Sequence, residues 1–575
     1  MKPLLTIVNL CVDFISGNNV SHALHNISLS VNKGEVVAIV GESGSGKSVT
    51  ALSVLQLIPS PPAVYKNGAI IFNNNGKEID LLKLTHQEIQ LIRGKEIAMI
   101  FQEPMSSLNP VQTCGHQVAE MLQLHKKINS ETAKAETIDL FKQVQLPAPK
   151  KMFYRYPHEI SGGQKQRVII AMAMSCNPQL LICDEPTTAL DVTVQKNILL
   201  LIRNLQQQKN MSVIFISHDL GVVSEIADKI IVMYRGKIVE QGKTKALLSN
   251  PQHPYTKALL ACRPALHSKN ERLPVVSDFM DTDEAGTIFE RINTNDQLRI
   301  NNEQLIIDQP LIKVENLKVW YPAHTTFLGK VTEYNKAVND VSFEIYKGET
   351  LGLVGESGCG KTTLGRCLLG LIPPTNGKIF FANKDISKAT GSEFRVMRKE
   401  MQIIFQDPYS SLNPRKKIGD AIAEPLKVHH LFASEKQRKQ KVIQLLEKVN
   451  LSADHYNRYP HEFSGGQRQR IVIARALALE PKFVVCDESV SALDVSVQAQ
   501  VLNLLNDLKK EFNFTALFIS HDLSVIRYIS DRIVVMNKGI IEETGNAGDL
   551  YLHPQTAYTK QLIASIPGVI YEPNI

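Results

Sequence analysis

GESGSGKS, residues 41–48, matches the phosphate-binding loop pattern G-x-x-x-x-G-K-[ST]. Residues 35–40 before it, EVVAIV, are apolar and β-branched and predict a buried strand, and residues 48–58 after it are apolar at helical spacing and predict a helix. In that context the loop amides and the positive end of the helix cradle a polyphosphate, with Lys47 at its outer phosphates and the Ser48 hydroxyl on Mg²⁺. The alternative, a glycine-rich turn, leaves both flanks unexplained. The sequence therefore predicts a nucleoside triphosphate site.

Length and composition limit the classes of protein that this chain can be. At 575 residues it is too long for one hydrophobic core, so two or more domains are expected. A net charge of +7 is mild for this length and does not indicate nucleic-acid binding. The eight cysteines are scattered with no C-x-x-C pair, which is typical of reduced thiols in a cytosolic protein and disfavours disulfides and zinc.

Neither a signal peptide nor a membrane span is expected. Asn9 and Asp13 interrupt the apolar start of the chain, and no apolar run approaches the ~18–20 residues that a spanning helix requires. If the protein works at a membrane, other chains must cross it.

The chain contains two copies of one sequence pattern. A second phosphate loop, GESGCGKT, occupies residues 355–362, and MIFQEPMSSLNP (99–110) recurs as IIFQDPYSSLNP (403–414). The matched carboxylates Glu185 and Glu488 are 303 residues apart, as are the two FISHDL segments. The first copy has extra residues near 64–80, a hairpin-like stretch. We therefore predict domains at 1–264 and 311–575, joined by a polar linker, 265–310, that is interpreted as a flexible tether with some local structure.

Paired carboxylates follow an apolar strand in each copy, in LLICDE and FVVCDE. Asp184 and Asp487 end a predicted strand, where they can orient Mg²⁺. The next residues, Glu185 and Glu488, can polarise an attacking water, which is the help that phosphoryl transfer needs. The alternative for such a pair is an exposed turn, which the phosphate loop upstream of the pair in both copies disfavours.

A histidine and a glutamine also recur at strand ends. His218 and His521 follow apolar strands, and Gln102 and Gln406 precede the SSLNP segments. A single histidine there is usually a packed or solvated imidazole, but recurrence favours a contact with the γ-phosphate. An uncharged amide can touch both metal and water.

SGGQ precedes a long predicted helix in both copies, at residues 161–164 and 464–467. Its exposed amides and the helix dipole form a second anion-binding surface. Each copy then carries two such surfaces, although one ATP needs only one loop. The surplus is resolved if each second surface closes on the ATP that the other copy holds.

The ordered set of motifs resembles the ATP-binding-cassette (ABC) ATPases over nearly the whole chain. The resemblance implies an α/β fold: two tandem P-loop domains, each with a RecA-like core, an antiparallel β subdomain and a helical signature subdomain. It also implies ATP and Mg²⁺ as ligands, head-to-tail pairing of the copies, and adenine stacking on Phe14 and Tyr321. Simple strand packing remains the alternative for Phe14. Asp191 and Asp494 match the loop that links the two sites.

The predicted site residues form three groups. The catalytic residues are Glu185, Glu488, His218, His521, Gln102 and Gln406. The metal ligands are Ser48, Thr362, Gln102, Gln406, Asp184 and Asp487. The nucleotide-binding residues are Phe14, Gly41, Glu42, Ser43, Gly44, Ser45, Gly46, Lys47, Ser48, Ser161, Gly162, Gly163, Gln164, Tyr321, Gly355, Glu356, Ser357, Gly358, Cys359, Gly360, Lys361, Thr362, Ser464, Gly465, Gly466 and Gln467.

Smaller motifs are similar to those of dipeptide, oligopeptide and nickel importer ATPases. These motifs are SSLNP after each glutamine, YPHE before each SGGQ, and HPYTKALLACRP at residues 253–264. The resemblance implies two membrane permease subunits, docked on Ser106–Pro110 and Ser410–Pro414, and a solute-binding protein. The capped turn is the alternative reading of SSLNP. Two ATPases in one chain resemble the fused subunits of glutathione- or microcin-type peptide importers.

The same resemblance implies a peripheral protein on the cytoplasmic face of the inner (plasma) membrane. Relatives in this group often carry a cysteine cluster after HPYT, but only Cys262 follows here, so no iron–sulfur cluster is expected. The alternative function is a soluble tandem-cassette ATPase that acts on ribosomes or nucleic acid. The polar linker, both histidines and the mild charge favour the importer.

Overall fold

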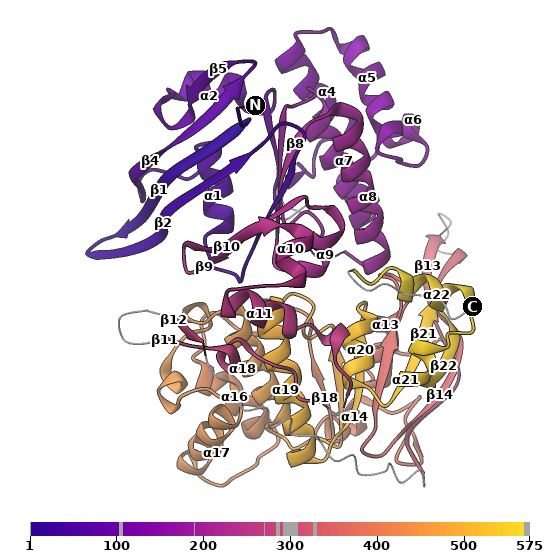
Figure 1. Ribbon diagram of the computed structural model, residues 1–575. Helices are drawn as coiled ribbons and strands as arrows, with labels where there is room; N and C mark the ends of the chain where they lie inside the picture. The colour runs from indigo at the N-terminus through magenta and orange to yellow at the C-terminus, as the bar shows by residue number, and fades with distance from the viewer. Residues whose placement is uncertain are drawn as a thin grey trace. The chain divides into compact units, whose positions relative to one another are not determined.

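The computed structural model describes residues 2–102, 107–188, 190–269, 271–282, 288–290, 309–325 and 331–567. Their contacts divide the chain into two units, one of residues 1–190, 194–260 and 276–292, and one of residues 191–193, 261–275 and 293–575. Each unit contains a four-stranded and a six-stranded sheet with helices around them (Figure 1). The predicted α/β class is confirmed in both copies.

The six-stranded sheet of the first unit has the order β10-β9-β3-β8-β7-β6. All neighbours run parallel except β10, which pairs antiparallel with β9. Every residue of β3, β7 and β8 is buried, because helices cover one face of the sheet and α1 with the four-stranded sheet covers the other. The strands are β3 (Val36–Val40), β6 (Ile97–Ile100), β7 (Leu180–Asp184), β8 (Ser212–Ser217), β9 (Lys229–Tyr234) and β10 (Lys237–Lys243).

The four-stranded sheet of this unit is antiparallel, in the order β2-β1-β4-β5. Its strands are β1 (Leu5–Ser16), β2 (Asn19–Val31), β4 (Ala63–Asn74) and β5 (Lys77–Asp80). The pairing of β4 with β5 confirms the hairpin expected near residues 64–80. One face of this sheet shares a hydrophobic core with Val37, Ile39 and Ile182 of the six-stranded sheet, so the two sheets form one body.

Besides α12, which is described below, ten α-helices belong to the described part of the first unit. In Figure 1, α4 to α6 gather on the side of the unit away from β1, β2 and β4, as a helical subdomain. The helices are α1 (Lys47–Val54), α2 (His86–Ile92), α4 (Cys114–Lys126), α5 (Ser130–Gln143), α6 (Pro149–Met152), α7 (Gly162–Met174), α8 (Val192–Lys209), α9 (Leu220–Ile226), α10 (Thr244–Ser249) and α11 (Pro254–Ala261).

The second unit repeats this plan, with sheet orders β14-β13-β16-β17 and β18-β19-β20-β15-β21-β22. Its strands are β13 (Pro310–Thr325), β14 (Val331–Tyr346), β15 (Thr350–Val354), β16 (Asn376–Phe381), β17 (Lys384–Asp385), β18 (Met401–Ile404), β19 (Phe483–Asp487), β20 (Thr515–Ser520), β21 (Arg532–Asn537) and β22 (Ile540–Asn546). Its helices are α13 (Lys361–Leu368), α14 (Gly391–Met397), α15 (Pro408–Ser411), α16 (Ile418–Val428), α17 (Glu435–Lys448), α18 (Gly465–Leu477), α19 (Val495–Phe512), α20 (Leu523–Ile529), α21 (Ala547–Leu552) and α22 (Ala557–Ala564).

The segment between the repeats differs in part from the expected flexible tether. Residues 261–275 pack with the second unit, and Leu273 is fully buried there. After them come α12 (Val276–Phe279) and a short hairpin of β11 (Met280–Thr282) and β12 (Ile288–Glu290). Residues 283–287 and 291–308 of the predicted linker lie outside the described residues. Apolar and hydrogen-bonding groups thus anchor the first part of a segment that composition alone marks as polar.

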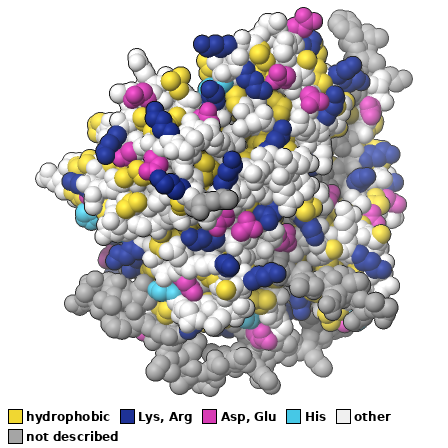
Figure 2. All heavy atoms as spheres, turned by 45° about the horizontal axis from the view of Figure 1, so that its top comes forward, with side chains coloured by type: hydrophobic (Ala, Val, Ile, Leu, Met, Phe, Trp, Pro, Cys, Tyr) yellow, Lys and Arg dark blue, Asp and Glu magenta, His cyan; other side chains and the backbone are white. Residues whose placement is uncertain are grey.

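No helix in the described residues is long and apolar enough to cross a membrane. On the face seen in Figure 2, lysine and arginine side chains are interspersed with aspartate and glutamate. The small positive net charge is therefore not gathered into one basic patch on that face.

Candidate functional site

The phosphate loop of each unit lies at the carboxyl ends of the parallel strands. β3 is the central strand, with β8 on one side and β9 on the other, and the loop joins its end to α1. This is the edge at which parallel sheets bind ligands. Gly41 (φ +155°) lies so close to the Met233 carbonyl oxygen that a Cβ would overlap it, and Gly355 has the same relation to Met536. Any side chain at the first glycine of either loop would collide with the neighbouring strand, so glycine is required there.

The lysine of each loop is buried and is held by the loop itself. Lys47 Nζ donates to the carbonyl oxygens of Gly41 and Glu42, both at 2.8 Å. Lys361 Nζ makes the matching bonds to Gly355 at 2.7 Å and Glu356 at 2.9 Å. Both ammonium groups are therefore placed inside the loop, where an anion would sit.

Each unit brings a hydroxyl and a carboxylate together beside the loop. Ser48 Oγ donates to Asp184 Oδ1 at 3.1 Å, and Thr362 Oγ1 donates to Asp487 Oδ1 at 2.9 Å. Burial raises the pKa of both aspartates, against the hydrogen bonds from these hydroxyls. A buried carboxylate that is costly to ionise alone favours a nearby cation. The described residues hold no cluster of three histidine, cysteine or acidic side chains that could bind a metal.

Glu185 collects the glutamine and histidine that the sequence predicted beside it. Gln102 Nε2 donates to Glu185 Oε2 at 3.1 Å, and His218 Nδ1 lies 3.3 Å from the same oxygen. Thr188, which sequence reasoning did not single out, donates to it at 3.1 Å. Burial acts to raise the pKa of Glu185, but His218 and Lys47 outweigh it and lower that pKa to about 2. The carboxylate is therefore ionised at any physiological pH.

Glu488 repeats this arrangement in the second unit. Gln406 Nε2 donates to Glu488 Oε2 at 2.7 Å, and His521 Nδ1 lies 3.6 Å away. Despite burial, His521 lowers the pKa of Glu488, and Glu488 in turn raises the pKa of His521. Glu185 and Glu488 also share a left-handed backbone, with φ +47° and +46°. A non-glycine residue held in that region is strained, and such strain gathers at functional sites.

A tyrosine supports each phosphate loop and was missed by the sequence analysis. The backbone N–H of Glu42 donates to the Tyr255 hydroxyl at 2.9 Å, and that of Glu356 donates to the Tyr558 hydroxyl at 3.2 Å. Tyr255 is on α11 and Tyr558 on α22, far from the loops in sequence. The signal was present, because the tripeptide YTK recurs at the constant offset of 303 residues.

The SGGQ segments begin helices, as expected. Ser161 and Ser464 are the N-caps of α7 and α18, and each forms a reciprocal capping box with the glutamine three residues on. A Cβ at Gly465 would meet nothing, whereas one at Gly466 would overlap Val497 of α19. The first glycine thus faces open space and the second permits close helix packing, so one motif serves two purposes.

The remaining predicted residues fall in less defined places. Tyr321, on β13, is 39% exposed. Phe14, on β1, is half-buried and packs against the hydrophobic core, so strand packing remains the alternative role for Phe14. Asp191 groups with the second unit, where its carboxylate accepts a hydrogen bond from the Ser357 amide of the loop.

The SSLNP segments combine a buried leucine with exposed neighbours. Ser106 lies outside the described residues, but Leu108 and its counterpart Leu412 are buried. In the second unit Tyr409 is 58% exposed, and residues 410–416 line a surface hollow of about 690 Å³ with Arg475, which donates to the Ser411 carbonyl at 2.6 Å.

Two protein families match the chain. The family described as ABC transporter matches residues 24–188 and 338–491. The family described as oligopeptide/dipeptide transporter, C-terminal region, matches residues 239–283.

Curated proteins similar to this chain cover almost all of it. The glutathione import ATP-binding protein GsiA of Pectobacterium atrosepticum is 46% identical over 568 residues, 98% of this chain and 90% of that protein. The protein of the same name from Escherichia coli (strain K12) is 45% identical over 578 residues, 99% of this chain and 90% of that protein. Among solved structures, the dimeric ATP-binding cassette MJ0796 bound to ADP and Pi is 27% identical, with a TM-score of 0.37 over 41% of this chain and 98% of that one.

Proposed function

This chain belongs to the ABC transporter ATP-binding proteins, and we propose that it hydrolyses ATP at two sites to drive a membrane importer of peptides or related small solutes. The observation that carries the proposal is the recurrence, in both units, of a buried loop lysine, a hydroxyl–aspartate pair and a glutamate bonded by glutamine and histidine. The names of its relatives support import, and the ribosome or nucleic-acid alternative has no observation in its favour.

In the proposed mechanism the loop amides and Lys47 bind the outer phosphates. Mg²⁺, held by Ser48, Asp184 and Gln102, would neutralise charge on the phosphoryl group. Glu185 accepts a hydrogen bond from the attacking water and orients it. Lys361, Asp487, Thr362 and Gln406 have the same roles in the second site, with Glu488.

We also propose that each site is completed by the SGGQ segment of the other repeat. The amides at Gly162 and Gly465 begin helices, and a Cβ at Gly465 would meet nothing within 4 Å, so an anion could approach there. On this proposal Ser464–Gln467 serve the ATP of Lys47, and Ser161–Gln164 serve that of Lys361.

The partners that we propose are two permease subunits and a solute-binding protein, with this chain peripheral on the cytoplasmic face of the membrane. The hollow beside Ser410–Pro414 and the exposed ring of Tyr409 offer a docking surface for a helix of a permease subunit. The oligopeptide/dipeptide transporter match at residues 239–283 supports the peptide class.

The test is ATP turnover by Glu185→Gln, Glu488→Gln and the double variant, with ATP binding measured in parallel. Glutamine keeps the size of the side chain but removes the charge that orients the water. We expect the double variant to lose at least about a hundredfold in kcat while it still binds ATP. Turnover at the parental rate in the double variant would show that these glutamates are not the catalytic ones.

A further inference from the structure

Residues Ala261–Val275, here called the strap, follow the last helix of the first repeat but pack with the second unit. We propose that the strap is a positioning element for the second nucleotide site, acting through α20, the helix that follows His521. The inference rests on the proposed function of that site and adds a cause for the two sites to differ.

The strap is fixed to α19 through its backbone. Leu273 N–H donates to Asn503 Oδ1 at 3.0 Å, and Asn503 Nδ2 donates to the Leu273 carbonyl at 2.8 Å. Leu273 and Asn503 are both almost fully buried. Buried amides that satisfy each other in this way are costly to separate, because each separation leaves a desolvated donor and acceptor. These two hydrogen bonds therefore fix the backbone of the strap at Leu273 to α19.

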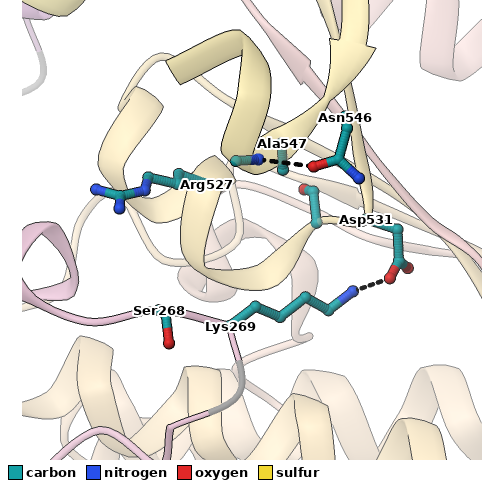
Figure 3. A pocket seen from close by; sticks show the side chains of 8 residues that line it. Ser268, Lys269, Arg527, Asp531, Asn546 and Ala547 are labelled. Carbon is teal, nitrogen blue, oxygen red and sulfur yellow. Dashed lines mark hydrogen bonds and ion pairs between the residues drawn. The ribbon is translucent and has the colours of Figure 1, made fainter. Parts of the chain in front are cut away.

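The same segment also binds α20. The hydroxyl of Tyr528, a fully buried residue of α20, donates to the Glu271 carbonyl at 3.0 Å and lies 3.2 Å from Asn503 Oδ1. Just beyond the helix, Asp531 pairs with Lys269 of the strap, as Figure 3 shows. Asp531 also accepts from the Thr350 amide at the start of β15, at 2.8 Å. One carboxylate therefore links the strap to the strand that leads into the phosphate loop.

The anchoring of the strap affects the second site because α20 cannot shift without displacing its neighbours. A Cβ at Gly352 of β15 would overlap Ile526 and Ser530, so α20 and the residue after it press directly on the strand. At its other end, Asp522 caps the helix and His521 comes directly before the cap. A shift of α20 would therefore move His521 relative to Glu488, and β15 with it.

The first repeat provides an internal comparison. At the 303-residue offset, Asn503 corresponds to Leu200, which is 53% exposed, and Tyr528 corresponds to Glu225. Asp531 corresponds to Asp228, which pairs with Arg203 of its own unit at 3.1 Å. Asn503 and Tyr528, which hold the strap backbone, thus have no like residue in the first copy, although the catalytic residues are shared by both copies. This is the pattern expected if the strap acts on the second site.

The test uses the full-length chain with Asn503→Leu, which introduces the residue of the first copy, and Tyr528→Phe, which removes one hydroxyl. Leu200→Asn is the matched control in the first copy. Two measurements are made: hydrogen exchange at the strap and α20, and trapping of 8-azido-ATP with orthovanadate, resolved between the peptides that contain Lys47 and Lys361.

We expect strap amides to exchange about five- to tenfold faster in Asn503→Leu. Trapping at the Lys361 peptide should fall severalfold while the Lys47 peptide changes by less than twofold, and Leu200→Asn should change neither. Equal loss at both peptides, or faster strap exchange with unchanged trapping, would overturn the positioning role. So would unchanged strap exchange in both variants. Absence of trapping at either peptide in the parent chain would instead contradict the proposed function.

Discussion

At the scale of single residues, the site depends on groups that hold the catalytic residues in place. Glu185 accepts from three side chains that come from three different segments, and Lys47 is fixed by two carbonyl oxygens of its own loop. The hydroxyl of Tyr255, on α11, accepts a hydrogen bond from the backbone amide of Glu42 in the loop. Such supports set the geometry of the loop before nucleotide arrives, so their loss should affect binding more than chemistry.

Tyr255→Phe tests this role of the tyrosine. The change removes the acceptor of the Glu42 amide, and an unpaired donor costs about 1–3 kcal/mol. We expect the affinity of the first site for ATP to fall roughly five- to tenfold with a smaller change in kcat. Binding of a fluorescent ATP analogue measures it, and Tyr558→Phe is the matched change in the other site. An unaltered affinity for the ATP analogue in both variants would show that the two tyrosines do not contribute to nucleotide binding.

Lys509 is a second residue whose environment has a measurable consequence. Its ammonium lies 2.6 Å from Thr350 Oγ1 and 3.5 Å from Asp531, near Lys269 of the strap and the carboxylate of Glu349. Burial, together with Lys269, lowers the pKa of Lys509 to about 8, although Asp531 and Glu349 oppose this. Gln206, a neutral residue, occupies the corresponding position in the first copy.

The sign of the pH dependence follows from that lowered pKa. Above pH 8 the folded state releases the proton while the unfolded chain keeps it up to about pH 10.5. The free energy of unfolding of the second unit should therefore rise between pH 8 and 10.5, by at most about 3 kcal/mol. Trp320, the only tryptophan, reports this unit in denaturant titrations. Lys509→Gln should flatten the rise, whereas Lys510→Gln, at an exposed neighbour, should leave it intact.

At the scale of elements, the N-terminus of α18 combines two requirements within two residues. Gly465 faces open space, where a phosphate could approach the helix amides, while Gly466 sits against Val497 of α19. The corresponding Gly163 in α7 sits against Val194 of α8 in the same way. In the SGGQ motif, the second glycine is therefore required by helix packing and the first leaves room for an anion. The sequence pattern alone does not distinguish these two requirements.

Gly466→Ala and Gly465→Ala separate these requirements. The methyl group of Gly466→Ala must displace Val497, and overpacking of this kind costs roughly 1–3 kcal/mol. Gly465→Ala adds its methyl group to open space and should change stability by less than about 0.5 kcal/mol. Denaturant midpoints followed by Trp320 fluorescence compare the two. Equal destabilisation would mean that the packing account of Gly466 is wrong.

At the scale of the whole molecule, the two copies share the proposed catalytic set and differ in other residues. The lysine, aspartate, glutamate, glutamine and histidine of both sites keep the same contacts, whereas Asn503 and Tyr528 have no like residue in the first copy. The SSLNP surface recurs in both copies but contributes no contact to either glutamate in the described residues. A segment that recurs in both copies outside the chemistry is suited to a partner.

Tyr409→Ala tests that surface. The ring is 58% exposed beside the hollow that residues 410–416 line, with Arg468 over its face at 4.6 Å. We expect the variant to hydrolyse ATP alone as the parent does but to copurify with the permease subunits at least severalfold less, since exposed aromatics often anchor interfaces. Exposed Tyr154, changed to Ala, is the control. Full retention of the permease subunits by Tyr409→Ala would show that Tyr409 is not part of the docking surface.

Most of the fold and of the site could be predicted from the sequence because their signals are local and repeated. Strand, glycine loop and helix around Lys47 follow each other within twenty residues, and the second copy tests each assignment. Tyr255 and the strap were missed because their partners are distant in sequence. Thr188 is only three residues from Glu185, and it was missed because spacing alone does not show that the two side chains meet. Polar composition made residues 265–275 look like solvent-exposed linker, although Asn503 and Tyr528 satisfy their backbone groups.

Strand burial, phosphate-loop geometry and carboxylate chemistry each demand particular residues at short spacing, so the order of residues alone predicts the two-copy architecture and the family, and it supports our proposal for the reacting groups. What holds those groups became visible in the folded chain: His218 and Lys47 lower the pKa of Glu185, a tyrosine supports each loop, and the end of the first repeat is anchored on α20 of the second unit. The physical reason is that hydrogen bonding and desolvation depend on distance in space, and hundreds of residues along the chain can separate atoms that lie 3 Å apart in the fold.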